Sequence, residues 1–421
     1  MSRSHPIGPP RGPREAVTRR TIQCRAIVAP DVSPVPAPGR SRRRSGRPAS
    51  IAALVVAVAA IFVAAAALRV GRTGSPPPAA ASLSPSVIPS AIAGVASDRG
   101  YLVSLAELRA RVATAAAGDE PEASALADLR AWAEVAVGDS PHAMEPLRID
   151  GTTGPFVDDS ATAYGLALAW GATGDRRYAE AARAEILAWA QTTRTLIGAC
   201  PSDGDCQTSL IVSRTAPAFV FAADLLATAQ VFTPDDTATF DVWLRTVILP
   251  AASERINNWG DAGVFLRVVA TDFLGDAPGF AAAIDGWRSQ LDLIAPDGHI
   301  PEEVRRGSSG LSYTQEALLY KLAVARIAER RGIDLWGYRG TAGGTLRSAL
   351  DYDARYQLDP AGWPWAPSVD VPTTGPGWEL AYAHWPDPDF AALLRPARPI
   401  GFPGHSAVRW TTLTNGVPLG G

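Results

Sequence analysis

The chain has 421 residues, of which 47% are hydrophobic and 19% are charged, and its formal net charge is −3. This length suffices to bury one sizeable core or two modest ones. The near-neutral charge argues against a general nucleic-acid-binding protein, because such a domain would be strongly basic. It does not exclude an acidic ligand, since a basic cleft can be hidden within a neutral total.

The N-terminal segment of the chain is rich in Arg and Pro and shows little apolar periodicity. A segment of this composition cannot bury enough apolar surface to offset the conformational entropy that is lost on ordering. We therefore expect residues 1–48 to be a disordered basic tail.

An uncharged, mostly apolar run follows between Arg47 and Arg69. Its length of about 20 residues matches the roughly 30 Å hydrocarbon core of a bilayer. It is longer, and lies deeper in the chain, than the core of an ordinary signal peptide. The alternative, a buried core helix, is disfavoured because the flanking segments offer nothing for it to pack against. Residues 49–69 are therefore predicted to form a single transmembrane helix.

The charge on either side of this run predicts the topology. The Arg cluster at 40–47 outweighs the basic residues after the run, so the N-terminus is expected in the cytoplasm. Residues 70–97, rich in Pro, Ser and Ala, are expected to form an extended linker. Residues 98–421 would then be an extracellular domain of a single-pass cell-membrane protein.

Two cysteines fall in this domain, Cys200 and Cys206, on either side of a turn-forming Pro-Ser-Asp-Gly-Asp sequence. In an oxidising compartment this spacing predicts a small disulfide loop, with two free thiols as the alternative. A metal site is not expected here, because two Cys without a nearby His do not complete a tetrahedral set.

From Tyr101 onward the apolar residues follow helical spacing nearly throughout, with breaks at Gly and Pro. No long stretch of alternating β-branched residues lies between residues 100 and 340. The clearest predicted helices span Ala161–Gly171, Tyr178–Gln191, Ala216–Ala229, Thr237–Ile248, Val264–Phe273 and Leu311–Arg331.

One turn motif occurs twice, as Thr-Gly-Asp at 173–175 and as Leu-Gly-Asp at 274–276. Each copy follows a predicted helix and opens another that carries an Ile and a Trp. Repeated helical hairpins form either an open α-solenoid or a closed α/α toroid. The toroid is favoured because the chain lacks the fixed short period of a solenoid. We expect an all-α fold, an incomplete α/α toroid with a central cleft, against which the Trp- and Pro-rich tail from Ala354 packs.

Two polar segments interrupt the helical pattern. The first is Asn-Asn-Trp-Gly at 257–260, and the second, at 301–313, is Pro-Glu-Glu-Val-Arg-Arg-Gly-Ser-Ser-Gly-Leu-Ser-Tyr. Asn, Arg and Tyr are suited to β-elimination of a uronate. Amide and guanidinium donors neutralise the C6 carboxylate, so that the C5 proton becomes acidic. A phenolate that a cation stabilises can take this proton, and the phenol can then protonate the departing O4.

These two segments resemble the alginate lyase family, in which a Leu-Pro-x-Glu-x-x-Arg-Gly loop is followed by Leu-x-Tyr. The resemblance covers roughly residues 155–385 and is strongest in 255–320. It implies an α/α toroid that breaks acidic polysaccharides by β-elimination, without water and usually without a metal. No cofactor is expected.

The resemblance assigns roles to particular residues. Tyr313 would be both base and acid, Arg306 would hold its phenolate and the substrate charge, and Asn258 would bind the C6 carboxylate. Asn257 would hold the loop. The alternatives are that Tyr313 packs its ring into the core and that the two Asn residues cap the end of a preceding helix.

The chain departs from the family at Trp259, where mannuronate-acting members commonly have His. Indole cannot accept a proton, so Trp259 is expected to stack on a sugar ring instead. His299, just before the second segment, is a further candidate for substrate binding, and its alternative is a solvated loop residue.

Two other functions stay open. A catalytically inactive glycan-binding ectodomain would keep the cleft without the family His. An α/α-toroid glycoside hydrolase would use paired carboxylates. Asp158-Asp159 and Glu302-Glu303 are candidates for such a pair, although adjacent acids point to different faces and the first two are expected to cap a helix. The leading hypothesis is a membrane-anchored extracellular lyase acting on an acidic, uronate-containing, alginate-like polysaccharide.

Overall fold

The computed structural model describes residues 100–202, 207–401 and 406–420. The predicted tail, transmembrane helix and linker lie outside these residues, as does Cys206. These segments and the predicted disulfide therefore stay predictions.

The described residues are mostly helical, with one two-stranded parallel sheet in which Leu147 pairs with Leu196. The strands are β1 (Leu147–Arg148) and β2 (Leu196–Ile197). The helices are α2 (Leu105–Ala116), α3 (Glu122–Ala136), α4 (Pro155–Thr173), α5 (Arg176–Thr192), α6 (Gln207–Thr215), α7 (Pro217–Thr228), α8 (Pro234–Trp243), a π-helix (Leu244–Ile248), a 3-10 turn (Leu249–Ala251), α9 (Asn258–Phe273), α10 (Ala277–Leu291), α11 (Pro301–Val304), a 3-10 turn (Gly307–Ser309), α12 (Gly310–Arg330), α13 (Leu346–Leu358), a 3-10 turn (Pro360–Gly362), α14 (Gly377–His384), α15 (Pro388–Leu394) and α16 (Thr411–Asn415).

The repeated turn motif forms two helical hairpins, α4–α5 and α9–α10, as predicted. Gly174 and Gly275 adopt left-handed backbone conformations, with φ of 74° and 64°. A residue without a Cβ takes up this conformation at little cost, which is why glycine ends the first helix of each hairpin. Asp175 and Asp276 then cap the second helix by accepting from the N–H groups of Arg177 and Gly279.

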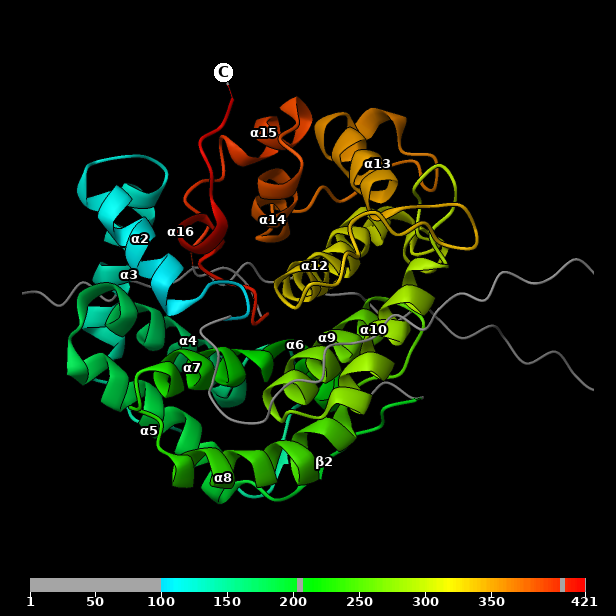
Figure 1. The fold of residues 1–421 in the computed structure, drawn as a ribbon. Coiled ribbons are helices and arrows are strands. Elements are labelled where there is room, and N and C mark those ends of the chain that lie inside the picture. The colour runs from blue at the N-terminus through cyan, green and yellow to red at the C-terminus, as the bar shows by residue number, and fades with distance from the viewer. Residues whose placement is uncertain (1–99, 203–206, 402–405, 421) are drawn as a thin grey trace, which may run out of the picture. The chain divides into compact units, whose positions relative to one another are not determined.

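The described helices pack one against the next in a circuit, so that the last helix contacts the first two. Contacts run from α3 to α4, from α4 to α7, from α6 to α9, and from α9 to α12. They continue from α12 to α14 and from α14 to α16, which packs against α2 and α3. Figure 1 shows the red helix α16 beside the cyan N-terminal helices. The prediction that the tail packs against the helical body is confirmed, and the closed order of contacts is that of an α/α toroid.

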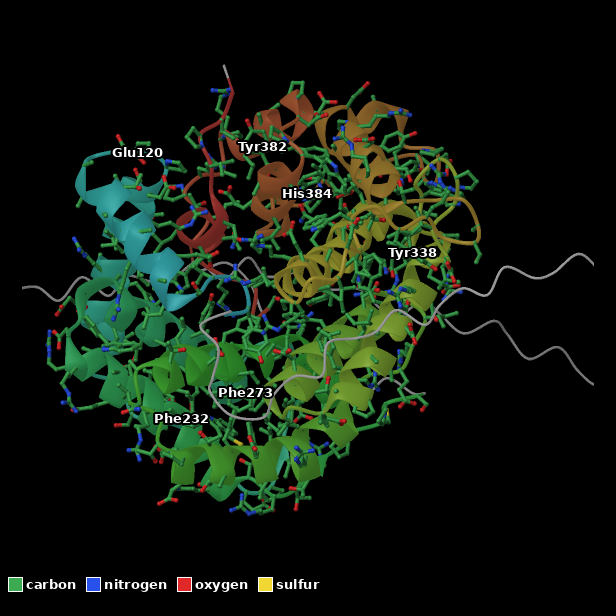
Figure 2. The ribbon with its side chains drawn as sticks, viewed as in Figure 1. Glu120, Phe232, Phe273, Tyr338, Tyr382 and His384 are labelled. Carbon is green, nitrogen blue, oxygen red and sulfur yellow. The ribbon has the colours of Figure 1, made fainter. Side chains whose placement is uncertain are left out.

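Aromatic side chains fill the space between the helices. Phe240 packs edge-on against Phe232 and Phe273, which are labelled in Figure 2. Among the described residues, the stretch Gln207–Thr228 is long and apolar enough to cross a membrane, and 89% of its apolar window is buried inside the protein. These two helices, α6 and α7, therefore belong to the core.

Two local predictions about helix starts are wrong. Asp158 and Asp159 do not cap a helix, because α4 already begins at Pro155, and a proline is favoured in the first turn. Asp159 is instead buried, and it accepts hydrogen bonds from Trp189 Nε1 at 2.8 Å and from the His142 backbone N–H at 2.6 Å. Likewise α9 begins six residues before the predicted Val264, with Asn257 as its N-cap.

The first turns of α9 lie directly against the preceding chain. A Cβ added to Gly260 would lie 1.5 Å from the Arg255 carbonyl oxygen, and one added to Gly263 would lie 1.8 Å from that of Ser253. Real Cβ atoms do not approach so closely, so these two glycines permit the contact that places Asn258.

Gly263→Ala should therefore destabilise the protein by about 3 kcal/mol or more, since the Ser253 backbone has to move away from the helix. Chemical denaturation measures this loss. Gly286→Ala in α10 is the control: its Cβ would meet only Val264 Cγ2 at 3.4 Å, so helix propensity should leave stability unchanged or slightly raised. Equal stability of the two variants would contradict the proposed packing.

Candidate active site

Asn258 lies at the N-terminus of α9 and is fully buried. Asn257 caps the helix, because its side-chain oxygen accepts from the Trp259 N–H at 3.1 Å. The Asn258 N–H donates to Glu303 Oε1 at 2.6 Å. A carboxylate at this position also meets the positive end of the helix dipole. The first polar segment is thus fixed by a residue of the second.

The second segment brings Arg306 against Tyr313. After α11, Gly307 takes a left-handed conformation with φ of 63°, and the chain turns into α12. Tyr313 lies in the first turns of α12, and the Arg306 guanidinium carbon is 3.9 Å from the centre of its ring. This is a close cation–π contact, which holds the positive charge beside the phenol.

Glu316 joins the two segments a second time. It lies one turn after Tyr313 on α12, and its Oε2 accepts from Asn258 Nδ2 at 3.1 Å. Its Oε1 accepts from Arg214 Nη1 at 2.8 Å, and Tyr320 donates to the same oxygen at 3.3 Å. Asn258 on α9 is therefore bonded to α11 and α12, and Glu316 links α12 to α6.

The C-terminal segment adds a further cation beside α6. The Ala407 N–H donates to the Arg214 carbonyl at 2.7 Å, and Arg409 Nε donates to the Ser406 carbonyl at 2.6 Å. Arg409 is only 2% exposed, and burial lowers the pKa of its guanidinium to about 10, against the attraction of Asp158. Two nearly buried arginines thus stand at one side of the site.

Glu303 is the most strongly perturbed carboxyl of this cluster. It is fully buried, and desolvation raises the pKa of Glu303 to about 7, although the Asn258 N–H and Arg306 favour the charged form. Arg306 Nε is 3.8 Å from Glu303 Oε2, too long for a hydrogen bond. Near neutral pH this group therefore changes between a charged and an uncharged state.

Several buried polar atoms of the cluster have no hydrogen-bond partner among the described residues. They are Asn258 Oδ1, Glu303 Oε2, and Arg214 Nε and Nη2. Buried polar groups are usually satisfied, so a concentration of unsatisfied ones is typical of a site that binds a polar ligand.

Two of the predicted substrate-binding residues, Trp259 and His299, are less exposed to solvent than expected. Trp259 is 8% exposed, and the Arg255 guanidinium carbon is 3.9 Å from the centre of its ring. His299 bonds to Asp297 at 2.7 Å and lies beside Trp365, with ring centres 5.1 Å apart. The structure therefore brings Asn258 and Arg306 together at Glu303, and Arg306 in turn contacts Tyr313, whereas His299 belongs to a neighbouring cluster.

Sequence reasoning missed Glu316, Arg214 and Arg409 as members of the site, and it considered Glu303 only as a possible hydrolase acid. Glu316 follows Tyr313 by three residues, which places both on one helix face. This spacing could have identified Glu316 from the sequence. Arg214, a charge within an otherwise buried helix, was a weaker signal. Nothing in the sequence points to Arg409, which reaches the site through tertiary packing.

Among residues 100–202, 207–401 and 406–420, no group of three or more His, Cys, Asp or Glu side chains is arranged to hold a metal ion. The expectation that the chain uses no metal or cofactor stays a prediction.

Known proteins resemble this chain in sequence and in fold. The family model for alginate lyases matches residues 109–363, more than half of the chain. The chain belongs to the alginate lyase family. A curated polysaccharide lyase of Stenotrophomonas maltophilia is 28% identical over 170 residues, which cover 36% of this chain and 50% of that protein. The chain thus matches about half the length of this relative.

Solved structures of family members share the fold. Alginate lyase A1-III of Sphingomonas species A1, complexed with a tetrasaccharide, has a TM-score of 0.60 at 18% identity, covering 78% of this chain and 98% of that one. An alginate lyase from Bacteroides ovatus has a TM-score of 0.55 at 18% identity, covering 75% and 98%. The mostly helical fold is therefore that of the alginate lyase α/α toroids.

Glu303→Gln should change how the stability of this family member depends on pH. The folded-state pKa of about 7 lies above the ordinary 4.5, so the folded protein holds the proton more tightly than the unfolded chain. The resulting stabilisation is complete below pH 4.5 and is lost as the pH rises through about 7. Relative to Glu303→Gln, the wild type should lose a few kcal/mol over this range.

Urea unfolding of both proteins between pH 4.5 and pH 8 measures the difference. Glu302→Gln, on the same turn but paired with Arg305 at the surface, serves as the control and should run parallel to the wild type. Parallel curves for Glu303→Gln as well would show that the buried carboxyl does not titrate in this range.

Proposed function

We propose that this chain is a polysaccharide lyase that cleaves a uronate-containing glycan by β-elimination. The observation that carries the proposal is the contact of Arg306 with the Tyr313 ring beside buried Asn258. These are the residue types that the reaction needs, and Glu303, which accepts from the Asn258 N–H, lies 3.8 Å from Arg306 Nε.

Neutralisation of the C6 carboxylate falls to Asn258 and Arg306. An amide donor and a guanidinium lower the charge on the carboxylate, so the C5 proton becomes more acidic. Asn258 Nδ2 donates to Glu316 in the structure, so a bound uronate would compete with Glu316 for this donor. Arg214 is placed to balance the charge of Glu316 when that happens.

Proton transfer falls to Tyr313. Its phenolate oxygen takes the C5 proton, the electron pair forms the C4–C5 double bond, and the C4–O4 bond breaks. The same phenol then gives its proton to the departing O4, so the enzyme returns to its starting state. Arg306 against the ring stabilises the negative charge that develops on this oxygen. One residue serves as base and acid because Trp259 offers no proton acceptor.

The substrate we propose is an acidic, alginate-like polysaccharide. Support comes from family membership and from alginate lyase A1-III, whose structure is described as complexed with a tetrasaccharide. The three arginines at the site, Arg214, Arg306 and Arg409, suit a polyanion.

The second candidate function is a glycan-binding protein without catalysis. It is favoured by one observation: the position of the family His is occupied by Trp259, which is 8% exposed and covered by Arg255. Such a protein would bind polyuronates and release no product.

We further propose that the lyase is anchored in the cell membrane by residues 49–69 and faces the outside, where Cys200 and Cys206 would be oxidised to a disulfide. Support comes from the apolar run and from the Arg cluster before it.

Tyr313→Phe should abolish turnover while leaving the fold intact, because it removes only the phenolic oxygen. Loss of a proton-transfer group lowers turnover by about 10²–10⁴-fold, and by more where one group has two roles. The rate is measured by the near-ultraviolet absorbance of the unsaturated product released from polyuronates.

Tyr338→Phe is the matched control, since its hydroxyl bonds to Asp292 on another part of the domain. It should retain wild-type turnover. Equal turnover of Tyr313→Phe and the wild type would exclude Tyr313 as the proton-transfer group. Binding of polyuronates by the wild type without any product would instead favour the glycan-binding function.

Protease added to intact cells should remove the C-terminal domain, because the Arg cluster at 40–47 is expected to stay in the cytoplasm. Immunoblotting against the C-terminus follows the cleavage. A cytoplasmic protein in the same cells should stay intact, and protection of the C-terminal domain would overturn the topology.

A further inference from the structure

One large aromatic side chain of the described residues is exposed. Trp365 is 42% exposed, whereas every other described Trp, Tyr and Phe is buried or half-buried. Aromatic rings at protein surfaces commonly serve as contacts for ligands, because they combine an apolar face with a polar edge.

The exposed indole is held in a fixed orientation. Its Nε1 donates to the Tyr352 hydroxyl at 2.7 Å. The His299 ring lies beside it, with ring centres 5.1 Å apart, and His299 is held by Asp297 at 2.7 Å. A ring that is already ordered loses little conformational entropy when a ligand binds to its face.

The loop that carries Trp365 lies along the candidate active site. Trp363 Nε1 donates to the Gly307 carbonyl at 3.1 Å, directly after Arg306. A Cβ on Gly307 would lie 4.0 Å from the Trp365 carbonyl oxygen. The Trp365 backbone therefore lies close to the turn between Arg306 and Tyr313.

Further along, the same loop follows the start of α12. The Asp370 N–H donates to the Ser308 carbonyl at 2.8 Å, and the Ser312 hydroxyl donates to the Asp370 carbonyl at 3.1 Å. Gln315 Nε2 donates to the Thr373 carbonyl at 3.0 Å. The loop thus runs alongside the segment that contains Tyr313 and is hydrogen-bonded to it.

We propose that Trp365, supported by His299, is a stacking platform for a sugar residue of the polyuronate chain next to the one that is cleaved. The inference rests on the proposed function, because it takes the ligand to be the same acidic polysaccharide. The indole face suits the apolar C–H face of a pyranose ring, and the ring edge and His299 are polar enough to meet its hydroxyls.

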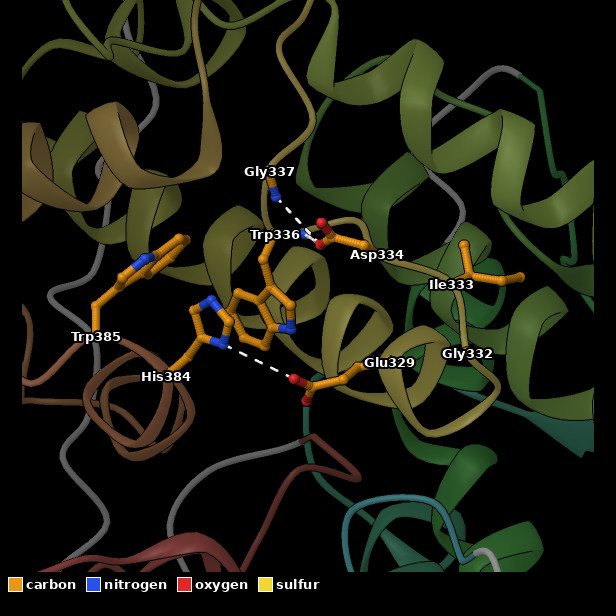
Figure 3. Close-up of a pocket in the computed structure, with 8 residues that line it drawn as sticks. All are labelled: Glu329, Gly332, Ile333, Asp334, Trp336, Gly337, His384 and Trp385. Atoms are coloured by element: carbon orange, nitrogen blue, oxygen red, sulfur yellow. Dashed lines mark hydrogen bonds and ion pairs between the residues drawn. The ribbon is translucent and has the colours of Figure 1, made fainter.

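The pocket shown in Figure 3 is the competing place for such a contact. It has a volume of about 480 Å³ and contains Trp336, His384 and Trp385. Its Trp336 ring is already covered by His384, at 4.1 Å and 8°. Glu329 and Asp334 also line it, and their carboxylates would repel a polyuronate. One carboxylate described above, that of Asp297, also lies near Trp365, but it is hydrogen-bonded to His299 at 2.7 Å.

The test measures binding rather than turnover. The full-length chain carrying Tyr313→Phe is titrated calorimetrically with saturated oligouronates of increasing length, alone and with Trp365→Ala. The affinity for long oligomers should fall about tenfold with Trp365→Ala, and the affinity for the shortest ligands should change little. Trp365→Phe keeps an aromatic face and should retain most of the affinity, which also guards against an effect of misfolding.

Trp385→Ala, in the pocket of Figure 3, is the matched control and should bind like its parent. Unchanged affinity with Trp365→Ala, or an equal loss with Trp365→Phe, would overturn the platform. A loss with Trp385→Ala alone would place the contact in the other pocket and overturn it as well. If the wild type binds in a Trp365-dependent way and cleaves nothing, the platform stands and the lyase fails. If it cleaves with no dependence on Trp365, only the platform fails.

Discussion

The interaction on which the site depends is the hydrogen bond from the Asn258 N–H to the Glu303 carboxyl. Asn258 opens α9 and Glu303 lies in α11, and 45 residues separate them in the sequence. The bond satisfies an N–H group that α9 leaves unpaired at its start. It also fixes the distance between the amide that would bind the uronate and the turn that carries Arg306. Everything proposed for Tyr313 assumes this register between the two segments.

Because the acceptor of this bond is Glu303, the net charge of the site depends on pH. Glu303 is buried among Asn258 and Arg306, and its pKa of about 7 means that its charge varies near neutrality. A protonated Glu303 leaves the charge of Arg306 available for an anionic substrate. An ionised Glu303 competes with that substrate for the same cation. Binding of a polyuronate should thus favour the protonated carboxyl, because the two negative charges share one guanidinium.

Local sequence signals predicted the helical hairpins and both polar segments. The Gly-Asp turns at 174–175 and 275–276 depend only on backbone conformation and a nearby cap, so they could be read from a few residues. The start of α4 differs from the prediction, because Pro155 opens the helix and the two acids lie within its first turns. Contacts that form only when the toroid of helices closes could not be predicted from the sequence. The Ala407 N–H reaches the Arg214 carbonyl, and brings Arg409 near α6, only because the C-terminal segment returns to the helical body.

In the proposed reaction the C4–O4 bond is broken by elimination rather than by water. Cleavage of a polyuronate by the full-length chain in oxygen-18-labelled water separates the two chemistries, with the products weighed by mass spectrometry. Elimination forms a C4–C5 double bond, so the new non-reducing end should be lighter than a hydrolysis product by one water, and no labelled oxygen should be incorporated by the cleavage itself. Products of full mass that carry one labelled oxygen per cleavage would show hydrolysis and contradict the account.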